Sequence, residues 1–314
     1  DTARPGLSHA RRLGSSGSGP SITTTGSSGN EGVVITPTGT GAFILGPKPD
    51  GTATGGNARG SYAVDLQMFR NSSTQVASGT RSFTCNGYNT ASGQASFAGG
   101  ELSSATNQYA FAFGPSGTIA SNSSAVAFAG GTSSGNTAFT VGANTASNSY
   151  TVALGTAALA DRYGQFSYAT TGFGGVSGTS QATIFITGKK TTDATPTELL
   201  LAGPQFGAGG LKLTIPSGKM MSGILIVQGV NSTGASCAQY VRQVVIKNVG
   251  GTTSLVGLAT PTTIGVDTED NVLTALSVTA EDANDSLNVT VTGIAAETWR
   301  WTAVFYGVET AYGT

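Results

Sequence analysis

Side chains capable of acid–base chemistry are scarce in this sequence. His9 is the only histidine among 314 residues, and it lies in a Gly- and Ser-rich stretch that cannot hold a preorganised base. Hydrolysis of a glycosidic bond usually needs two carboxylates at a controlled separation, and the central region offers only Glu101 and Asp161. Because no nucleophile, base and orienting group can be assigned together, we expect that the protein is not an enzyme.

Two groups of acidic residues carry the oxygen ligands that Ca²⁺ prefers. They are Asp267, Glu269 and Asp270, and Glu281, Asp282 and Asp285. Neither group matches the D-x-[DN]-x-[DN]-G loop, so we interpret both as solvated turns. Cys85 and Cys237 form no C-x-x-C pair and are expected to be buried thiols. The sequence therefore predicts no metal and no cofactor.

Two tryptophans near the C-terminus are the remaining candidates for ligand contact. Trp299 and Trp301 alternate along the last predicted strand and therefore share one face of it. Exposed indoles can stack on sugars, but a buried core is the preferred interpretation. No receptor-contacting residue can be assigned, although the loops around Asn231, Gly251 and Asp282 are expected to be exposed.

Composition limits the partners that the chain can bind. The formal net charge is −1, and only 10% of the residues are charged, which argues against a nucleic-acid partner because phosphate binding needs clustered Lys and Arg. No apolar run reaches the roughly eighteen residues that a membrane-spanning helix requires, so we expect no membrane insertion. The 47 glycines point to a chain that buries its surface by repetition or by association.

Residues 76–170 contain a short repeat, and this is the strongest pattern in the sequence. Its lines are SFTCNG (82–87), SFAGG (96–100), AFAFG (110–114), AVAFAG (125–130), AFTVG (138–142) and TVALG (151–155), with starts 14, 14, 15, 13 and 13 residues apart. Such a period predicts a solenoid of small stacked coils. Large and small residues alternate in each line, which is the period of a β-strand.

Stacking of the coils would align the large residues in two columns, which we predict to form the core of the repeat. The predicted core residues are Phe83, Phe97, Phe111, Val126, Phe139 and Val152 in one column and Phe113, Phe128, Val141 and Leu154 in the other, with Cys85 and Gly99 also in the second. The Ala and Ser face is expected to pack against neighbouring chains, because small residues permit close approach. Between Phe83 and Ala160 the only charged residue is Glu101, which favours a surface covered by identical subunits.

Two known families share features with these lines. NTASGQASFAGG (89–100) and NTASNSYTVALG (144–155) resemble the YadA-like head repeats of trimeric autotransporter adhesins. That resemblance implies a left-handed parallel β-roll in a homotrimer. PDGTATGGNARGSYAVDLQ (49–67) and TQVASGTR (74–81) are similar to phage and prophage tail-fibre proteins. The sequence shows neither a coiled-coil stalk nor a membrane barrel, so the tail-fibre resemblance is preferred.

The flanks of the repeat complete the predicted domain organisation. Residues 1–30 are interpreted as a flexible arm that attaches to other virion proteins, and 31–75 as an adaptor with short strands. Within the adaptor, Val64, Leu66 and Met68 fit an alternating strand, whereas Leu66, Met68 and Phe69 fit one helical turn. A linker at 171–180 leads to a C-terminal domain at 181–314, whose alternating runs and turn signals predict an antiparallel β-sandwich or jelly roll.

The patterns predict an all-β fold, and the tail-fibre resemblance implies a structural fibre of a bacteriophage particle, a tail fibre or similar appendage located on the virion. Its expected partners are two further copies of itself, other virion proteins and a host-surface receptor or glycan. Three alternatives remain open: a decoration or collar fibre that binds no receptor, a tailspike-like polysaccharide depolymerase, and the head of a bacterial trimeric adhesin.

Overall fold

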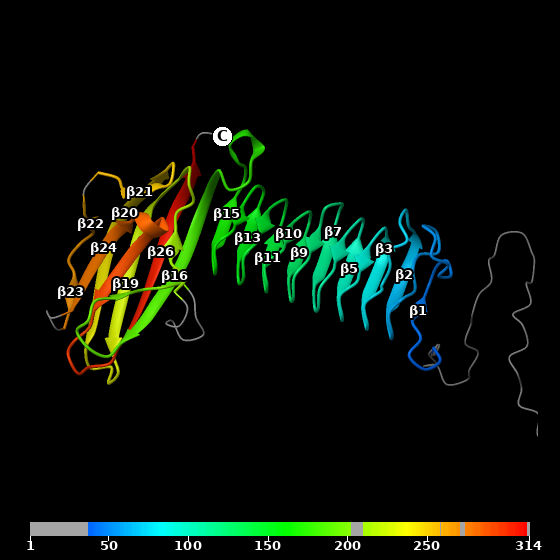
Figure 1. Ribbon diagram of the computed structural model, residues 1–314, viewed down its shortest axis with the longest axis horizontal. Coiled ribbons are helices and arrows are strands. Elements are labelled where there is room, and N and C mark those ends of the chain that lie inside the picture. The colour runs from blue at the N-terminus through cyan, green and yellow to red at the C-terminus, as the bar shows by residue number, and fades with distance from the viewer. Residues whose placement is uncertain (1–36, 202–209, 258, 271–273, 313–314) are drawn as a thin grey trace, which may run out of the picture. The chain divides into compact units, whose positions relative to one another are not determined.

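The computed structural model describes residues 37–201, 210–257, 259–270 and 274–312 of the chain (Figure 1). The predicted arm at 1–30 lies outside these residues. The regular secondary structure of the described part is β-strand, apart from two short 3₁₀ turns at Phe173–Gly175 and Asp282–Asn284. No helix in the described ranges has the length and apolar character needed to span a membrane.

The adaptor region contains two strands, β1 (Phe43–Ile44) and β2 (Val64–Phe69), which pair in parallel. The strand interpretation of 64–68 is confirmed and the helical turn is wrong. Asp65 and Gln67 are buried on the inner face of β2, while Val64 and Leu66 lie on its other face. β2 pairs in parallel with the first strand of the repeat and so begins the stack.

The repeat forms a parallel β-solenoid in which each coil contributes one strand to each of two sheets (Figure 1). The main roll sheet continues from β2 through β3 (Phe83–Gly87), β5 (Phe97–Gly100), β7 (Phe111–Gly114), β9 (Val126–Phe128), β11 (Phe139–Val141), β13 (Val152–Gly155) and β15 (Phe166–Ala169). The second roll sheet contains β4 (Thr90–Ala91), β6 (Ser104–Ala105), β8 (Ile119–Ala120), β10 (Thr132–Ser133), β12 (Thr145–Ala146) and β14 (Leu159–Ala160). The left-handed turn and the threefold arrangement implied by the resemblance stay predictions.

The interior of the solenoid is lined by small residues, which corrects the predicted assignment of the two faces. Two clusters of fully or almost fully buried alanines fill it, including Ala98, Ala112 and Ala127 from the main roll sheet and Ala105 and Ala120 from the second. The small face, which was expected to meet neighbouring chains, is therefore internal. The predicted core columns lie on the outer face of the main roll sheet instead.

The length of the corners explains why the small face is internal. Only residues 88 and 89 join β3 to β4, and only 142–144 join β11 to β12. Two packed sheets with large side chains between them lie about 10 Å apart. A corner of two residues reaches that distance only when it is almost fully extended, so corners this short favour a thinner interior. Alanine, serine and threonine are small enough for the thinner interior that these corners allow.

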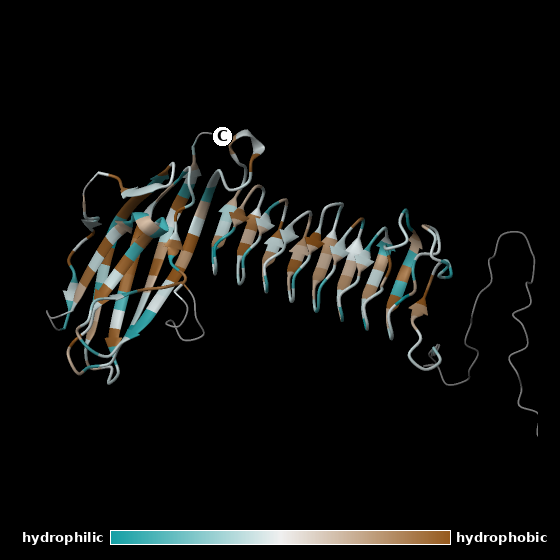
Figure 2. Ribbon diagram, viewed as in Figure 1, coloured by the Kyte–Doolittle hydropathy of each residue, from teal (hydrophilic) through white to brown (hydrophobic). Residues whose placement is uncertain are grey.

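The C-terminal region contains two antiparallel sheets. Four long strands extend the main roll sheet in the order β16 (Ser180–Thr191), β26 (Trp299–Ala311), β19 (Lys219–Asn231) and β20 (Cys237–Val249), and β20 also pairs with β21 (Thr252–Leu255), β22 (Thr262–Thr263) and β23 (Thr268–Glu269). The opposing sheet has β17 (Thr197–Glu198), β25 (Ser286–Thr292), β18 (Leu213–Thr214) and β24 (Ala275–Glu281). The alternating hydropathy of the long strands is visible along their length in Figure 2.

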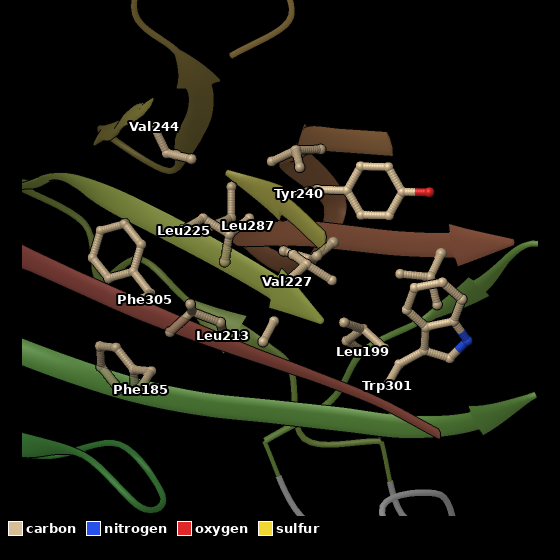
Figure 3. Packing of buried hydrophobic residues seen from close by; sticks show 14 of the residues in the cluster. Phe185, Leu199, Leu213, Leu225, Val227, Tyr240, Val244, Leu287, Trp301 and Phe305 are labelled. Carbon is tan, nitrogen blue, oxygen red and sulfur yellow. The ribbon is translucent and has the colours of Figure 1, made fainter. Parts of the chain in front are cut away.

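Both C-terminal sheets contribute side chains to one hydrophobic core (Figure 3). Phe185, Leu225 and Phe305 come from the long strands, and Leu213 and Leu287 come from the opposing sheet. At about 25 cal/mol for each Å² of apolar surface removed from water, this core is the main source of stability for the region. The prediction of antiparallel strands here is confirmed.

The last coil joins the C-terminal region through a continuous hydrogen-bonded sheet. β15 pairs antiparallel with β16, in a register that places Phe166 opposite Ile184 and Tyr168 opposite Ala182. The direction of pairing therefore changes from parallel to antiparallel at one strand without an interruption of the sheet.

Candidate self-association surface

The outer face of the main roll sheet carries two aligned columns of apolar side chains. The strand register confirms their alignment: the first column runs through Phe83, Phe97, Phe111, Val126, Phe139 and Val152, and the second through Phe113, Phe128, Val141 and Leu154. The columns begin one coil earlier, because Val64 pairs with Phe83 and Leu66 with Cys85. We call this set of residues the apolar face.

Neighbouring rings of the apolar face stack along the solenoid. The ring centroids of Phe83 and Phe97 are 5.1 Å apart, and those of Phe97 and Phe111 are 4.6 Å apart, with nearly parallel planes in both pairs. The ring of Phe97 is stacked between its two neighbours, yet the stacked rings remain only partly buried. Phe113 remains 44% exposed and Val141 38% exposed. A single chain therefore presents a long strip of apolar surface to solvent.

Gly99 occupies a column position for a steric reason. A Cβ at this residue would lie 2.8 Å from a ring carbon of Phe113 and 3.0 Å from the sulfur of Cys85. The Phe113 ring thus fills the space that a side chain at 99 would need. Cys85 is half-buried, and burial raises the pKa of its thiol, consistent with a thiol that takes the place of an apolar residue.

The opposite side of the roll is polar. The outward positions of the second roll sheet are mainly hydroxyl residues, among them Thr90, Ser104, Thr132 and Thr145. The roll therefore has one apolar and one hydroxyl-rich outer face. An asymmetry of this kind is expected where one side is covered by another molecule and the other stays in water.

A buried charge cluster near the beginning of the solenoid was not predicted from the sequence. The Asp65 carboxylate, which is fully buried, accepts hydrogen bonds from Arg59 Nε at 2.5 Å, Arg70 Nη2 at 2.9 Å and Thr84 Oγ1 at 2.9 Å. The side chains of Arg59 and Arg70 are 1% and 0% exposed. Burial lowers the pKa of Arg59, and the Asp65 carboxylate opposes this effect.

A second charge cluster links the last coil to the C-terminal strands. Arg162 Nη2 donates to the buried Glu309 carboxylate, which also accepts from Lys219. Arg162 Nη1 donates to the Thr214 carbonyl at 3.1 Å, and its guanidinium lies 4.7 Å from the centre of the Phe185 ring. The partners are far apart in sequence, and no local pattern reveals them.

Comparison with known proteins yields distant structural likenesses only. No family model matches the chain, and no curated protein matches its sequence. Among solved structures it is similar to tailspike gp49 of Acinetobacter baumannii bacteriophage Fri1, a capsular polysaccharide depolymerase, at 11% identity over 86% of this chain and 44% of that one, with a TM-score of 0.22.

Two further tailspikes give the same result. That of Acinetobacter phage vB_ApiP_P1 is 10% identical over 81% of this chain and 55% of its own, with a TM-score of 0.20. That of Acinetobacter baumannii phage AM24 is 12% identical over 85% and 49%, with a TM-score of 0.21. The chain spans about half the length of these tailspikes.

The two carboxylates considered for glycoside hydrolysis lie in different coils. Glu101 follows β5 directly and is exposed, whereas Asp161 follows β14 and lies beside Arg162 and Lys219. The structure does not bring them together as an acid and a base. Asp161 belongs to the charge cluster that contains Glu309.

The acidic groups considered as calcium sites have protein partners. Asp267 pairs with both terminal nitrogens of Arg242 at 2.6 and 2.7 Å, and Asp270 accepts the backbone amide of Cys237. Asp282 and Asp285 accept the backbone amide and the hydroxyl of Thr253. Of the remaining two acids, Glu269 accepts a hydrogen bond from Thr274 and Glu281 one from Lys212. Within the described ranges no group of three possible metal ligands occurs.

The tryptophans lie inside the C-terminal core, as the sequence analysis preferred. Trp299 is 0% and Trp301 2% exposed, and their rings stack at 5.4 Å. Trp301 Nε1 donates to Thr191 Oγ1 at 3.1 Å. Neither ring is available to stack on a ligand. Cys237 is exposed, so the expectation of a buried thiol at this position is wrong.

Proposed function

We propose that the chain is a structural subunit of a virion appendage, a tail fibre or similar structure of a bacteriophage particle, and that it acts as a homotrimer. The observation that carries the proposal is the apolar face, which lies outside the alanine interior and stays partly exposed to water in every coil. The repeat and adaptor lines that resemble adhesin heads and tail fibres supply the biological setting.

Self-association is the physical requirement of this proposal. Exposed apolar strips larger than a few hundred Å² are rare on monomeric proteins, and copies of one solenoid have the same strand spacing of about 4.8 Å. Identical columns can therefore meet side chain by side chain over many coils. Three copies around a common axis would bury their apolar faces and leave their hydroxyl-rich faces in water.

Gel filtration with light scattering on the recombinant chain tests the proposal. We expect a stable trimer, and a stable monomer would refute it. The double substitution Phe111→Asp and Phe113→Asp should dissociate the trimer, because it would bury six carboxylates, two from each chain, at the contact between the subunits. Thr132→Asp on the opposite face is the matched control and should leave the trimer intact.

Contact with the host surface is the second element of the proposal. Purified trimer should bind host cells and displace infecting particles if the appendage carries the receptor contact. If the trimer neither binds host cells nor displaces infecting particles, the result would instead favour a decoration or collar fibre that binds no receptor.

We also propose that the subunit has no catalytic activity. Asp65, Glu309 and Asp267, three of its partly or fully buried acids, hold arginine side chains, which fits a structural role for them. Release of reducing ends from host capsule or lipopolysaccharide by the purified trimer would contradict this part and restore the depolymerase alternative.

A further inference from the structure

We infer that the C-terminal sheet forms a second part of the same self-association surface, so that copies of this chain contact one another through β16, β26 and β19 as well as through the roll. The inference rests on the proposed function and adds to it. It places the subunit contacts of the C-terminal region on one defined face of its long strands.

The register of the main sheet carries the argument. The first apolar column does not end with the roll but crosses the junction without a change of face. Beyond Val152 it passes through Phe166, Ile184, Tyr306 and Ile224, each directly opposite the next. The second column continues in the same way from Leu154 through Tyr168, Ala182 and Val308.

The continued part is at least as exposed as the roll. Tyr306 is 49% exposed, Val308 54% and Ile186 52%. All three lie on the side of their strands opposite the buried core residues Phe185 and Phe305. No other described residue of the chain buries these three side chains, although all three are large and apolar.

The apolar region has a defined boundary on the same strands. Along β26, Val304, Tyr306 and Val308 give way to Thr302 and Arg300 on the same face. Gln228 is the neighbour of Thr302 on β19. A contact surface with an apolar centre and a polar rim is the usual anatomy of a protein interface.

The size of the surface favours another copy as its occupant. Eight roll strands at about 4.8 Å cover about 38 Å, and two columns about 10 Å wide give about 400 Å². Three further strands with three apolar positions each add about 300 Å². The sum of about 700 Å² approaches the roughly 800 Å² per partner of a stable interface, and the roll alone supplies only about half of that area.

The shape and charge of the junction agree with this occupant. A hollow there is lined in part by Tyr168, Ala182 and Val308, so it opens among the column residues and can receive apolar side chains of a neighbouring copy. The column positions from Phe166 to Ile224 contain no charged residue, and a copy with the same row can pack on them without burying a charge.

Hydroxyl-radical footprinting of the unmodified chain, read by mass spectrometry, tests the inference. Tyr306 and Tyr150 are a matched pair, at 49% and 54% exposure in one chain, but Tyr150 lies at a corner of the roll. We expect Tyr306 to be oxidised at least about fivefold more slowly than Tyr150 in the assembled protein, and at a similar rate once denaturant separates the chains. Equal rates in the assembled protein would overturn the inference.

A second measurement separates this inference from the proposed function. In a chain that also carries Cys85→Ser and Cys237→Ser, the thiol introduced by Tyr306→Cys should react with a thiol reagent more than about tenfold more slowly than the thiol introduced by Thr302→Cys. If the chain is a trimer that the double replacement at Phe111 and Phe113 dissociates, yet both thiols react equally fast, only the C-terminal contact is wrong. If the chain is a monomer, both proposals fail.

Discussion

The Asp65 carboxylate offers the sharpest test of how the start of the solenoid is stabilised. It is the only acid hydrogen-bonded to the two buried guanidinium groups of Arg59 and Arg70 among the described residues. Asp65→Asn keeps the size of the side chain but removes the negative charge and turns one acceptor into a donor. The variant therefore leaves two buried cations without a counter-charge.

The expected loss follows from the burial of all three side chains. Breaking a buried ion pair by removing one partner costs about 3–5 kcal/mol, because the remaining charge is desolvated and unpaired. Asp267→Asn is the matched control, since the side chain of Asp267 is 32% exposed beside Arg242. A partly exposed pair is worth about 1 kcal/mol or less, so the two substitutions should differ by at least about 2 kcal/mol.

Hydrogen exchange at the amides of β2 and β3 measures this difference locally. At about 1.4 kcal/mol per factor of ten, Asp65→Asn should speed their exchange roughly a hundredfold or more, while Asp267→Asn leaves them unchanged. A chain in which Arg59, Asp65 and Arg70 are all replaced by apolar residues should recover much of the loss. Equal effects of the two Asn substitutions would refute the role assigned to the cluster.

Two further predictions concern single residues. Gly142 and Gly130 both have strongly positive φ, +98° and +90°, but a Cβ at Gly142 would overlap the carbonyl of Gly155 whereas the space at Gly130 is open. Gly142→Ala should therefore lower the free energy of unfolding by about 1–3 kcal/mol more than Gly130→Ala, measured as a lower midpoint of chemical unfolding. Equal midpoints for the two variants would contradict the close packing of the coils. A hydrogen bond to Asp270 raises the pKa of the Cys237 thiol. In a chain that also carries Cys85→Ser, Asp270→Asn should lower this pKa and therefore speed the reaction of Cys237 with a thiol reagent at pH 8. An unchanged reaction rate would count against the contact between Asp270 and Cys237.

The strands and their alignment could be predicted from the sequence because both depend on local periodicity. A repeat of 13 to 15 residues with alternating large and small positions places Phe97 opposite Phe111 and Phe139 opposite Val152, as the register confirms. The two charge clusters could not be predicted in this way. Glu309 and Arg162 are 147 residues apart, and Asp65 is indistinguishable in the sequence from an ordinary solvated acid.

The choice between inner and outer face shows where periodicity stops being sufficient. Alternation places Ala112 on one face of the strand and Phe111 and Phe113 on the other, but it does not say which face is internal. Hydrophobicity alone favours the large residues as the core. Burial decides the question: Ala112 is 0% exposed and Phe113 is 44% exposed. Short corners such as residues 88–89 favour the thin interior that alanine fills. Burial of the large residues then has to come from outside the chain. The alanine interior and the outward aromatic side chains thus favour self-association, because a solenoid this thin cannot cover its own aromatic rings.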